Sequence, residues 1–161
     1  MPLKIGQPLP EITLKQKTDA GLVDVSLRRN VGKGKTVILF VPLAFTGVCT
    51  DELCKVTGLL DEYKKLGADV IAISVDSPFA QEAWVKQANI GLTLVSDFNR
   101  VAVKTFKVKD TRVIPEKTGL LNVAKRSVFV ADKAGNVIHS EVKRDPSSMP
   151  NFAKIKKAVE A

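Results

Sequence analysis

Residues 36–41 read Thr-Val-Ile-Leu-Phe-Val, a continuous apolar run that ends at Pro42. An uninterrupted run of this length is typical of a strand buried on both faces, as in a parallel sheet covered by helices. Two further runs of the same kind, Val70–Val75 and Ser127–Ala131, follow later in the chain. These three segments predict the centre of a sheet that is covered on both sides.

The segments between and after these runs have helical patterns. From about Val48 to Leu66, apolar residues recur at helical spacing, and Gly67 ends the pattern. Three shorter helices are predicted, over Ser77–Gln87, Asn99–Phe106 and Asn151–Val159. Because a β-α-β-α-β order calls for parallel strands with right-handed crossovers, we expect helices on both faces of the sheet.

Short strands are expected outside the central runs as well. They lie at 11–15, 22–27, 94–96 and 137–142, and the last of them forms a hairpin with 127–131. The predicted fold class is therefore α/β, a single domain over residues 1–161 with a mixed central sheet. Residues 107–125 have no clear periodicity and are expected to form an irregular connection.

Length and composition indicate an ordinary globular chain. It has 161 residues, of which 45% are hydrophobic and 26% are charged, which fits one domain with a core of its own. No apolar run approaches the roughly 18 residues of a membrane span, and the N-terminus has no apolar signal segment. We therefore expect a cytoplasmic protein without a membrane partner. Two cysteines and one histidine argue against a disulfide framework and a zinc site.

The formal net charge of +8 is concentrated in the second half of the chain. Residues 81–161 contain 15 Lys and Arg against 8 Asp and Glu, whereas residues 1–80 contain 10 against 9. The basic residues occur in pairs and small groups, without aromatic interleaving or zinc-finger spacing. A solvated basic surface is the favoured interpretation. A binding module for nucleic acid is the alternative class of function, and its affinity should fall steeply with salt.

Cys49 follows the first buried strand and stands at the predicted start of a helix. In open α/β sheets, ligands bind at the loops beyond the carboxyl ends of the strands. The free N–H groups and the dipole of a helix N-terminus favour an anion, which for cysteine is the nucleophilic thiolate. Position alone leaves two interpretations open, a reactive nucleophile and a buried packing residue.

The spacing of Cys49 and Cys54 argues against other cysteine chemistries. A C-x-x-C motif would need cysteine where Glu52 stands, and a phosphatase C-x5-R loop would need arginine where Lys55 stands. Five residues along an ideal helix separate two Cα atoms by roughly 8.6 Å, beyond the roughly 7 Å that a disulfide spans. A thiol–disulfide oxidoreductase, which needs two cysteines poised for exchange without unfolding, is therefore disfavoured.

Residues 42–49, Pro-Leu-Ala-Phe-Thr-Gly-Val-Cys, have the pattern P-x-x-x-T-x-x-C. This pattern resembles the active-site signature of the peroxiredoxins, which are thiol peroxidases with a thioredoxin-like fold. Residues 49–54, Cys-Thr-Asp-Glu-Leu-Cys, resemble the bacterioferritin-comigratory (peroxiredoxin Q) branch, whereas residues 42–49 and 119–126 look closer to one-cysteine, alkyl-hydroperoxide-reductase-E-like members. The resemblance extends over segments 5–10, 72–78, 96–97 and 124–130. It implies a thioredoxin-like fold with an N-terminal extension.

The resemblance also implies the site residues. Cys49 would be the peroxidatic cysteine, with Thr46 and Arg126 completing its pocket. Pro42 would shield it. Cleavage of a peroxide O–O bond needs a thiolate, hydrogen-bond donors and a positive group near the leaving oxygen, and threonine and arginine supply the last two. Glu52 has two open interpretations, a residue that orients Arg126 or a favourable acid in the first turn of the helix.

Two catalytic cycles are compatible with this resemblance. In the favoured cycle, the sulfenic acid of Cys49 condenses with Cys54 after the first helical turn unwinds. A thioredoxin-like or glutaredoxin-like dithiol then reduces the disulfide. In the alternative, Cys54 is a small core residue and an external thiol resolves the sulfenic acid. No metal, haem or flavin is implied, the protein would be a monomer or a homodimer, and His139 is expected at the surface.

Overall fold

The computed structural model describes residues 1–112, 114 and 116–161. Within these residues, seven strands form one mixed sheet with the order β2-β1-β5-β4-β3-β6-β7. The strands are β1 (Thr13–Thr18), β2 (Gly21–Ser26), β3 (Thr36–Phe40), β4 (Asp69–Ser74), β5 (Thr93–Ser96), β6 (Ser127–Ala131) and β7 (Val137–Val142). The helices are α1 (Gly47–Lys65), α2 (Pro78–Ala88), α3 (Val101–Thr105) and α4 (Phe152–Glu160).

The centre of the sheet is parallel and its edges are antiparallel. β3 pairs with β4 and β4 with β5, all three in parallel. β6 runs antiparallel to β3, with Phe40 opposite Ser127, and β7 runs antiparallel to β6. All five residues of β3 and of β6 are buried, as the apolar runs predict. The mixed sheet expected from the sequence is confirmed.

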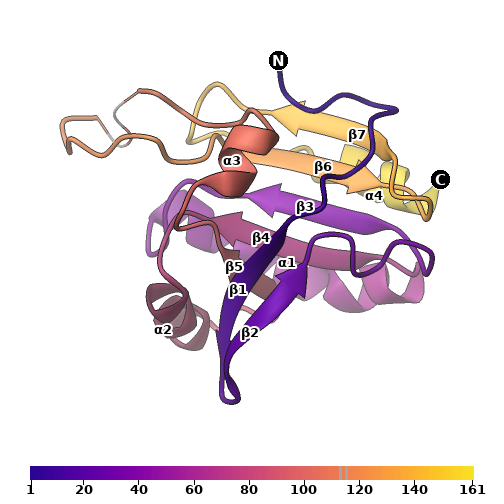
Figure 1. The fold of residues 1–161 in the computed structure, drawn as a ribbon, viewed down its shortest axis with the longest axis horizontal. Coiled ribbons are helices and arrows are strands. Elements are labelled where there is room, and N and C mark those ends of the chain that lie inside the picture. Colours follow the sequence, from indigo (N-terminus) through magenta and orange to yellow (C-terminus); the bar gives the residue numbers. More distant parts are fainter. Residues whose placement is uncertain (113, 115) are drawn as a thin grey trace.

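Alternation along β3 divides the core into two layers. Val37 and Leu39 face a cluster that includes side chains of α1, α2 and α4. Ile38 and Phe40 face the opposite cluster, built from α3 and the N-terminal segment. Figure 1 shows α3 on the near side of the sheet and α1 behind it. The prediction of helices on both faces is confirmed.

The β1–β2 hairpin is longer than its sequence pattern indicates. Both strands reach the two-residue turn Asp19-Ala20, whereas the apolar pattern predicts a first strand that ends at Lys15. The last part of β1 is half-buried or exposed, so its polar side chains carry no alternation for sequence analysis to detect. Within the described part of the chain, no helix is both long and apolar enough to cross a membrane.

The predicted irregular connection at 107–125 includes Val113 and Pro115, which lie outside the described residues. Its described part contains no helix or named strand. The two ends of the connection are nevertheless tied together, because the N–H of Lys125 donates to the carbonyl of Val108 at 2.7 Å. This hydrogen bond holds Lys125, two residues before β6, next to Val108.

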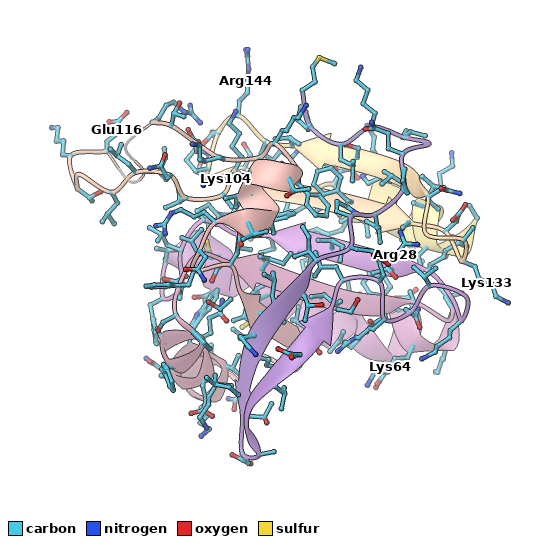
Figure 2. All side chains as sticks on the ribbon, viewed as in Figure 1. Arg28, Lys64, Lys104, Glu116, Lys133 and Arg144 are labelled. Carbon is cyan, nitrogen blue, oxygen red and sulfur yellow. The ribbon has the colours of Figure 1, made fainter. Side chains whose placement is uncertain are left out.

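Basic side chains are spread around the molecule. Lys64, Lys133 and Arg144 are exposed and project outward on different sides of the ribbon (Figure 2). This distribution supports the interpretation of the net positive charge as a solvated surface.

Candidate active site

The N-terminus of α1 places Cys49 beside the carboxyl end of β3. The first intrahelical bond runs from the N–H of Thr50 to the carbonyl of Thr46 at 3.0 Å, so the helix itself does not use the N–H groups of residues 47–49. This end of the helix carries the positive end of its dipole. Cys49 is 1% exposed. Its sulfur therefore sits near the positive end of the helix dipole and away from most of the solvent.

Arg126 brings a guanidinium group to the sulfur. It is the last residue before β6 and is 2% exposed. Its Nη2 group donates to Cys49 Sγ at 3.4 Å. The carbonyl of Pro146 accepts from Nε at 3.1 Å and from Nη2 at 2.8 Å. Because these donors form a rigid planar fork, the carbonyl fixes the direction in which the guanidinium faces the sulfur.

Glu52 completes a buried charged group. Its carboxylate Oε2 accepts from Nη1 of Arg126, and its side chain is fully buried. Burial raises the pKa of Glu52 to about 7, and Arg126 opposes this rise while Glu141 adds to it. Burial also lowers the pKa of Arg126, but Cys49 and Glu52 outweigh it and the net direction is upward. Arg126 therefore keeps its charge between two acidic partners.

Thr46 and Pro42 line the same cavity as Cys49. Thr46 is the N-cap of α1, and its hydroxyl donates to the carbonyl of Leu43 at 2.8 Å. Donation from this hydroxyl to a peroxide, as the resemblance implies, therefore requires its hydrogen to turn away from Leu43. The cavity has a volume of about 250 Å³ and is lined by Pro42, Leu43, Thr46, Gly47, Val48, Cys49, Ile114, Arg126, Pro146 and Ser147. It is large enough for a small polar molecule held between apolar walls.

Cys54 lies away from this cavity. Both cysteines are free thiols, but Cys49 is buried and Cys54 is exposed. The sulfur of Cys54 is 3.5 Å from the carbonyl of Ala88, at the end of α2. The interpretation of Cys54 as a small core residue is therefore wrong, because this position of α1 points to solvent. Exposure leaves its thiol accessible to a second sulfur or to a partner protein.

Comparison with known proteins identifies the family. The family described as AhpC/TSA matches residues 5–140. The chain belongs to the AhpC/TSA family. Among its relatives, the chloroplastic 2-Cys peroxiredoxin BAS1 of Hordeum vulgare is 31% identical, over 86% of this chain and 65% of its own length. Alkyl hydroperoxide reductase E of Mycobacterium bovis is also 31% identical, over 88% of this chain and 87% of its own length. The chain spans about half to two thirds of the length of several curated relatives.

Solved structures of the AhpC/TSA family have the same architecture. The reduced 2-Cys peroxiredoxin of Plasmodium vivax is 25% identical and superposes with a TM-score of 0.84, covering 99% of this chain and 82% of its own. Prx3 of Vibrio vulnificus, solved with hydrogen peroxide, is 28% identical with a TM-score of 0.81, covering 98% and 99%. The predicted peroxiredoxin family and fold class are confirmed. The branch within the family stays a prediction, because the relatives include both a 2-Cys peroxiredoxin and an alkyl hydroperoxide reductase E.

Two residues of this AhpC/TSA site could not be predicted from any motif or periodic pattern in the sequence. Pro146, whose carbonyl holds Arg126, and Ile114, which lines the cavity, lie in loops without a pattern. A backbone carbonyl can be supplied by any residue type, so no sequence motif identifies Pro146. Ile114 comes from the connection that the sequence describes only as irregular.

His139 is less exposed than its sequence position suggests. Its side chain is 16% exposed, and its Nε2 lies 3.4 Å from Oε2 of Glu141. The expectation of a surface residue is therefore wrong. His139 pairs across the sheet with Val130, and Val130 belongs to the core layer under α1 and α4. Because cross-strand partners share a face, the histidine points into that layer.

The raised pKa of Glu52 predicts a pH-dependent stability. A carboxyl whose pKa rises from 4.5 when unfolded to about 7 when folded binds its proton more tightly in the folded protein. The free energy of unfolding that Glu52 contributes should therefore be highest below pH 4.5 and decrease as the pH rises through about 7. Glu52→Gln should remove this contribution. Chemical denaturation of both proteins across this range measures it, and parallel pH profiles would contradict it.

Proposed function

We propose that this chain is a thiol-dependent peroxidase that reduces hydrogen peroxide and small organic hydroperoxides. The observation that carries the proposal is the 3.4 Å contact between Arg126 Nη2 and a buried Cys49 sulfur at a helix N-terminus. A nucleophile, a fixed positive charge and a small cavity are the parts that peroxide cleavage requires. The similarity to Prx3 of Vibrio vulnificus, whose structure contains hydrogen peroxide, supports this substrate class.

The chemical step is a displacement at oxygen. The thiolate of Cys49 attacks one peroxide oxygen, a sulfur–oxygen bond forms, and the oxygen–oxygen bond breaks. The sulfur becomes a sulfenic acid, and the leaving oxygen takes a proton to give water or an alcohol. The N–H groups of Arg126 stabilise the charge that develops during the transfer. Thr46 would contribute a hydrogen bond to the peroxide once its hydroxyl turns from Leu43.

The apolar walls of the cavity strengthen the charged contacts on which the reaction depends. Leu43, Val48 and Ile114 line the cavity with apolar groups, which strengthens the charged contacts inside it. Pro42 is buried beside them and has no N–H of its own to compete for the thiolate. We assign to it the shielding role that the family resemblance implies.

Resolution by Cys54 is the second half of the proposal. The sulfenic acid of Cys49 and the thiol of Cys54 would form a disulfide with release of one water. The first turn of α1 must open for this step, and the indole N–H of Trp84, which donates to Thr50 Oγ1 at 3.0 Å, must release it. A thioredoxin-like or glutaredoxin-like dithiol would then reduce the disulfide by exchange. The exposure of Cys54 supports this cycle.

Intact mass after one equivalent of peroxide tests the proposal. Loss of two hydrogens per chain is expected, because an intramolecular disulfide forms. Gain of one oxygen would support the peroxidase but overturn the role of Cys54. An unchanged mass with unreacted peroxide would overturn the proposed function itself.

Replacement of Cys54 by serine should separate the reduction of peroxide by Cys49 from the reduction of the oxidised enzyme by thioredoxin. We expect Cys54→Ser to leave the first turnover nearly unchanged, since Cys49, Thr46 and Arg126 are untouched. Turnover with thioredoxin should be lost, and the sulfenic acid should over-oxidise to the sulfinic form. Because Cys54 is exposed, the melting temperature should hardly move. Thioredoxin-coupled turnover equal to that of the parent would show that Cys54 does not resolve.

A further inference from the structure

Three polar contacts join α1 to α2 and to the turn that follows α2. From the N-terminus of α1, the pairs are Thr50 with Trp84 at 3.0 Å, Cys54 with Ala88 at 3.5 Å and Thr57 with Gly91 at 3.0 Å. On α1, the three positions are spaced by four and then by three residues. Because residues with this spacing share one face of a helix, the contacts form a single stripe along α1.

The first and the third contact of this stripe have the same chemistry. In each, a threonine hydroxyl donates to the carbonyl four residues earlier, from Thr50 to Thr46 at 2.8 Å and from Thr57 to Leu53 at 2.7 Å. Each hydroxyl oxygen also accepts an N–H from the α2 side. Thr50 directly follows Cys49, whereas Thr57 lies beyond the second cysteine. Only the first contact therefore holds the turn that must open before the two cysteines can meet.

The donor of this first contact is buried. Trp84 is 1% exposed, and its indole group has one hydrogen-bond donor and no acceptor. When the first turn of α1 opens, Thr50 moves away and the indole N–H loses its acceptor. A buried donor without a partner costs free energy. Opening of the turn is therefore opposed by the contact with Trp84 as well as by the hydrogen bonds of the helix itself.

Trp84 also contacts the segment before α1. Its ring centroid lies 6.3 Å from that of Phe45, which immediately precedes the N-cap Thr46. Phe45 has a φ of 63°, a left-handed conformation that a bulky residue adopts only at a cost in free energy. Trp84 therefore contacts the chain on both sides of Cys49, at Phe45 and at Thr50.

We propose that Trp84 and Thr50 are positioning residues for the resolving step, and that their hydrogen bond sets how often the first turn of α1 opens. This inference rests on the proposed function, including resolution by Cys54. In the resolving step, the sulfur of Cys54 forms a bond to the sulfur of Cys49, and the sulfur–oxygen bond of the sulfenic acid breaks. The hydroxyl group leaves as water with the thiol proton of Cys54. Cys54 is oxidised and the sulfenic sulfur is reduced.

The frequency of opening decides between two fates of the sulfenic acid. In the closed helix, a second peroxide molecule oxidises it to the sulfinic acid. In the open helix, Cys54 condenses with it. Over-oxidation is proportional to the peroxide concentration, whereas condensation within one chain does not depend on it. A stronger bond between Trp84 and Thr50 should therefore allow over-oxidation at a lower peroxide concentration.

Rapid quenching with acid, followed by intact mass, tests the proposal. The mass distinguishes the sulfenic acid, the disulfide and the sulfinic acid in every variant, without the fluorescence of Trp84. Thr50→Val leaves the indole N–H unpaired in the closed helix, so condensation should accelerate roughly 10-fold. Trp84→Phe removes the donor and leaves no unpaired group, so the acceleration should be smaller, roughly threefold. In each variant, the peroxide concentration that over-oxidises half of the chains should rise by the same factor.

The matched control is Thr57→Val. It removes a hydroxyl with the same kinds of partner from the same face of α1, in a turn that stays helical. It should lower the free energy of unfolding about as much as Thr50→Val, but condensation should stay within about twofold of the parent rate. In the Trp84→Phe background, Thr50→Val should have a smaller effect than in the parent, because the bond that it breaks is already gone.

The masses separate failure of this inference from failure of the proposed function. If the parent gains no oxygen and forms no disulfide, the proposed function is wrong. If the parent gains oxygen but never loses water, Cys54 does not resolve, and the role of Trp84 and Thr50 is wrong with it. If the parent forms the disulfide but Thr50→Val and Trp84→Phe condense at the rate of Thr57→Val, only the role of their hydrogen bond is wrong. Two variants, one on each side of the bond, keep this comparison decisive if either is unstable.

Discussion

Replacement of Cys49 by serine is expected to abolish peroxide reduction, with a rate loss on the order of 10³-fold or more. The serine hydroxyl stays protonated at neutral pH and is a far weaker nucleophile than a thiolate. Its oxygen can still accept from Arg126, which lies within reach of the present sulfur. The fold should therefore survive, with a change in unfolding free energy of about 1 kcal/mol. Peroxide consumption and chemical denaturation of the same variant measure both quantities.

Cys54→Ser is the matched control for that experiment. It makes the same chemical change at the exposed cysteine of the same helix, so its first turnover should equal that of the parent. A Cys49→Ser chain that consumed peroxide at the parent rate would overturn the proposed function. Equal losses in the two variants would instead indicate that both cysteines take part in the first step.

Most of the fold follows from apolar patterns in the chain. β3, β4 and β6 are buried on both faces, and each is a continuous apolar run such as Val37–Phe40. α1 was predictable because its inward residues recur at helical spacing and Gly67, with φ of 76°, ends it. The first β-hairpin is less well predicted, because the end of β1 consists of half-buried polar side chains that show no apolar alternation.

The candidate site was predictable in part, since a local motif fixes Pro42, Thr46 and Cys49 on one strand-to-helix turn. Arg126 is 77 residues from Cys49, and spacing alone gives no reason for their contact. It was identified through the family resemblance. Glu52 left two interpretations open, and the structure favours the one in which it contacts Arg126. Tertiary packing brings together the residues around Glu52 and Arg126, and no periodic pattern in the sequence predicts such packing.

Replacement of Arg126 by lysine should reduce the rate of Cys49 oxidation by about 10²- to 10³-fold although the positive charge is retained. The guanidinium group contacts the Cys49 sulfur, the Glu52 carboxylate and the Pro146 carbonyl at once. An ammonium group is a single point of charge and cannot reach all three partners. The loss should appear in the chemical step, measured by stopped-flow oxidation at saturating peroxide and by the dependence of the rate on peroxide concentration.

Arg29→Lys is the control for this substitution. Arg29 also makes a two-pronged contact with a carboxylate, at 2.7 and 2.9 Å from Asp69, but its ion pair lies at the start of β4 rather than at the cavity. It should leave the rate of Cys49 oxidation unchanged and cost at most about 1 kcal/mol of stability. Arg126→Lys should cost more, about 1–3 kcal/mol, because a buried acceptor loses its donor. A parent-like rate in Arg126→Lys would mean that positive charge alone suffices, and that the directed fork of donors has no part in cleaving the peroxide bond.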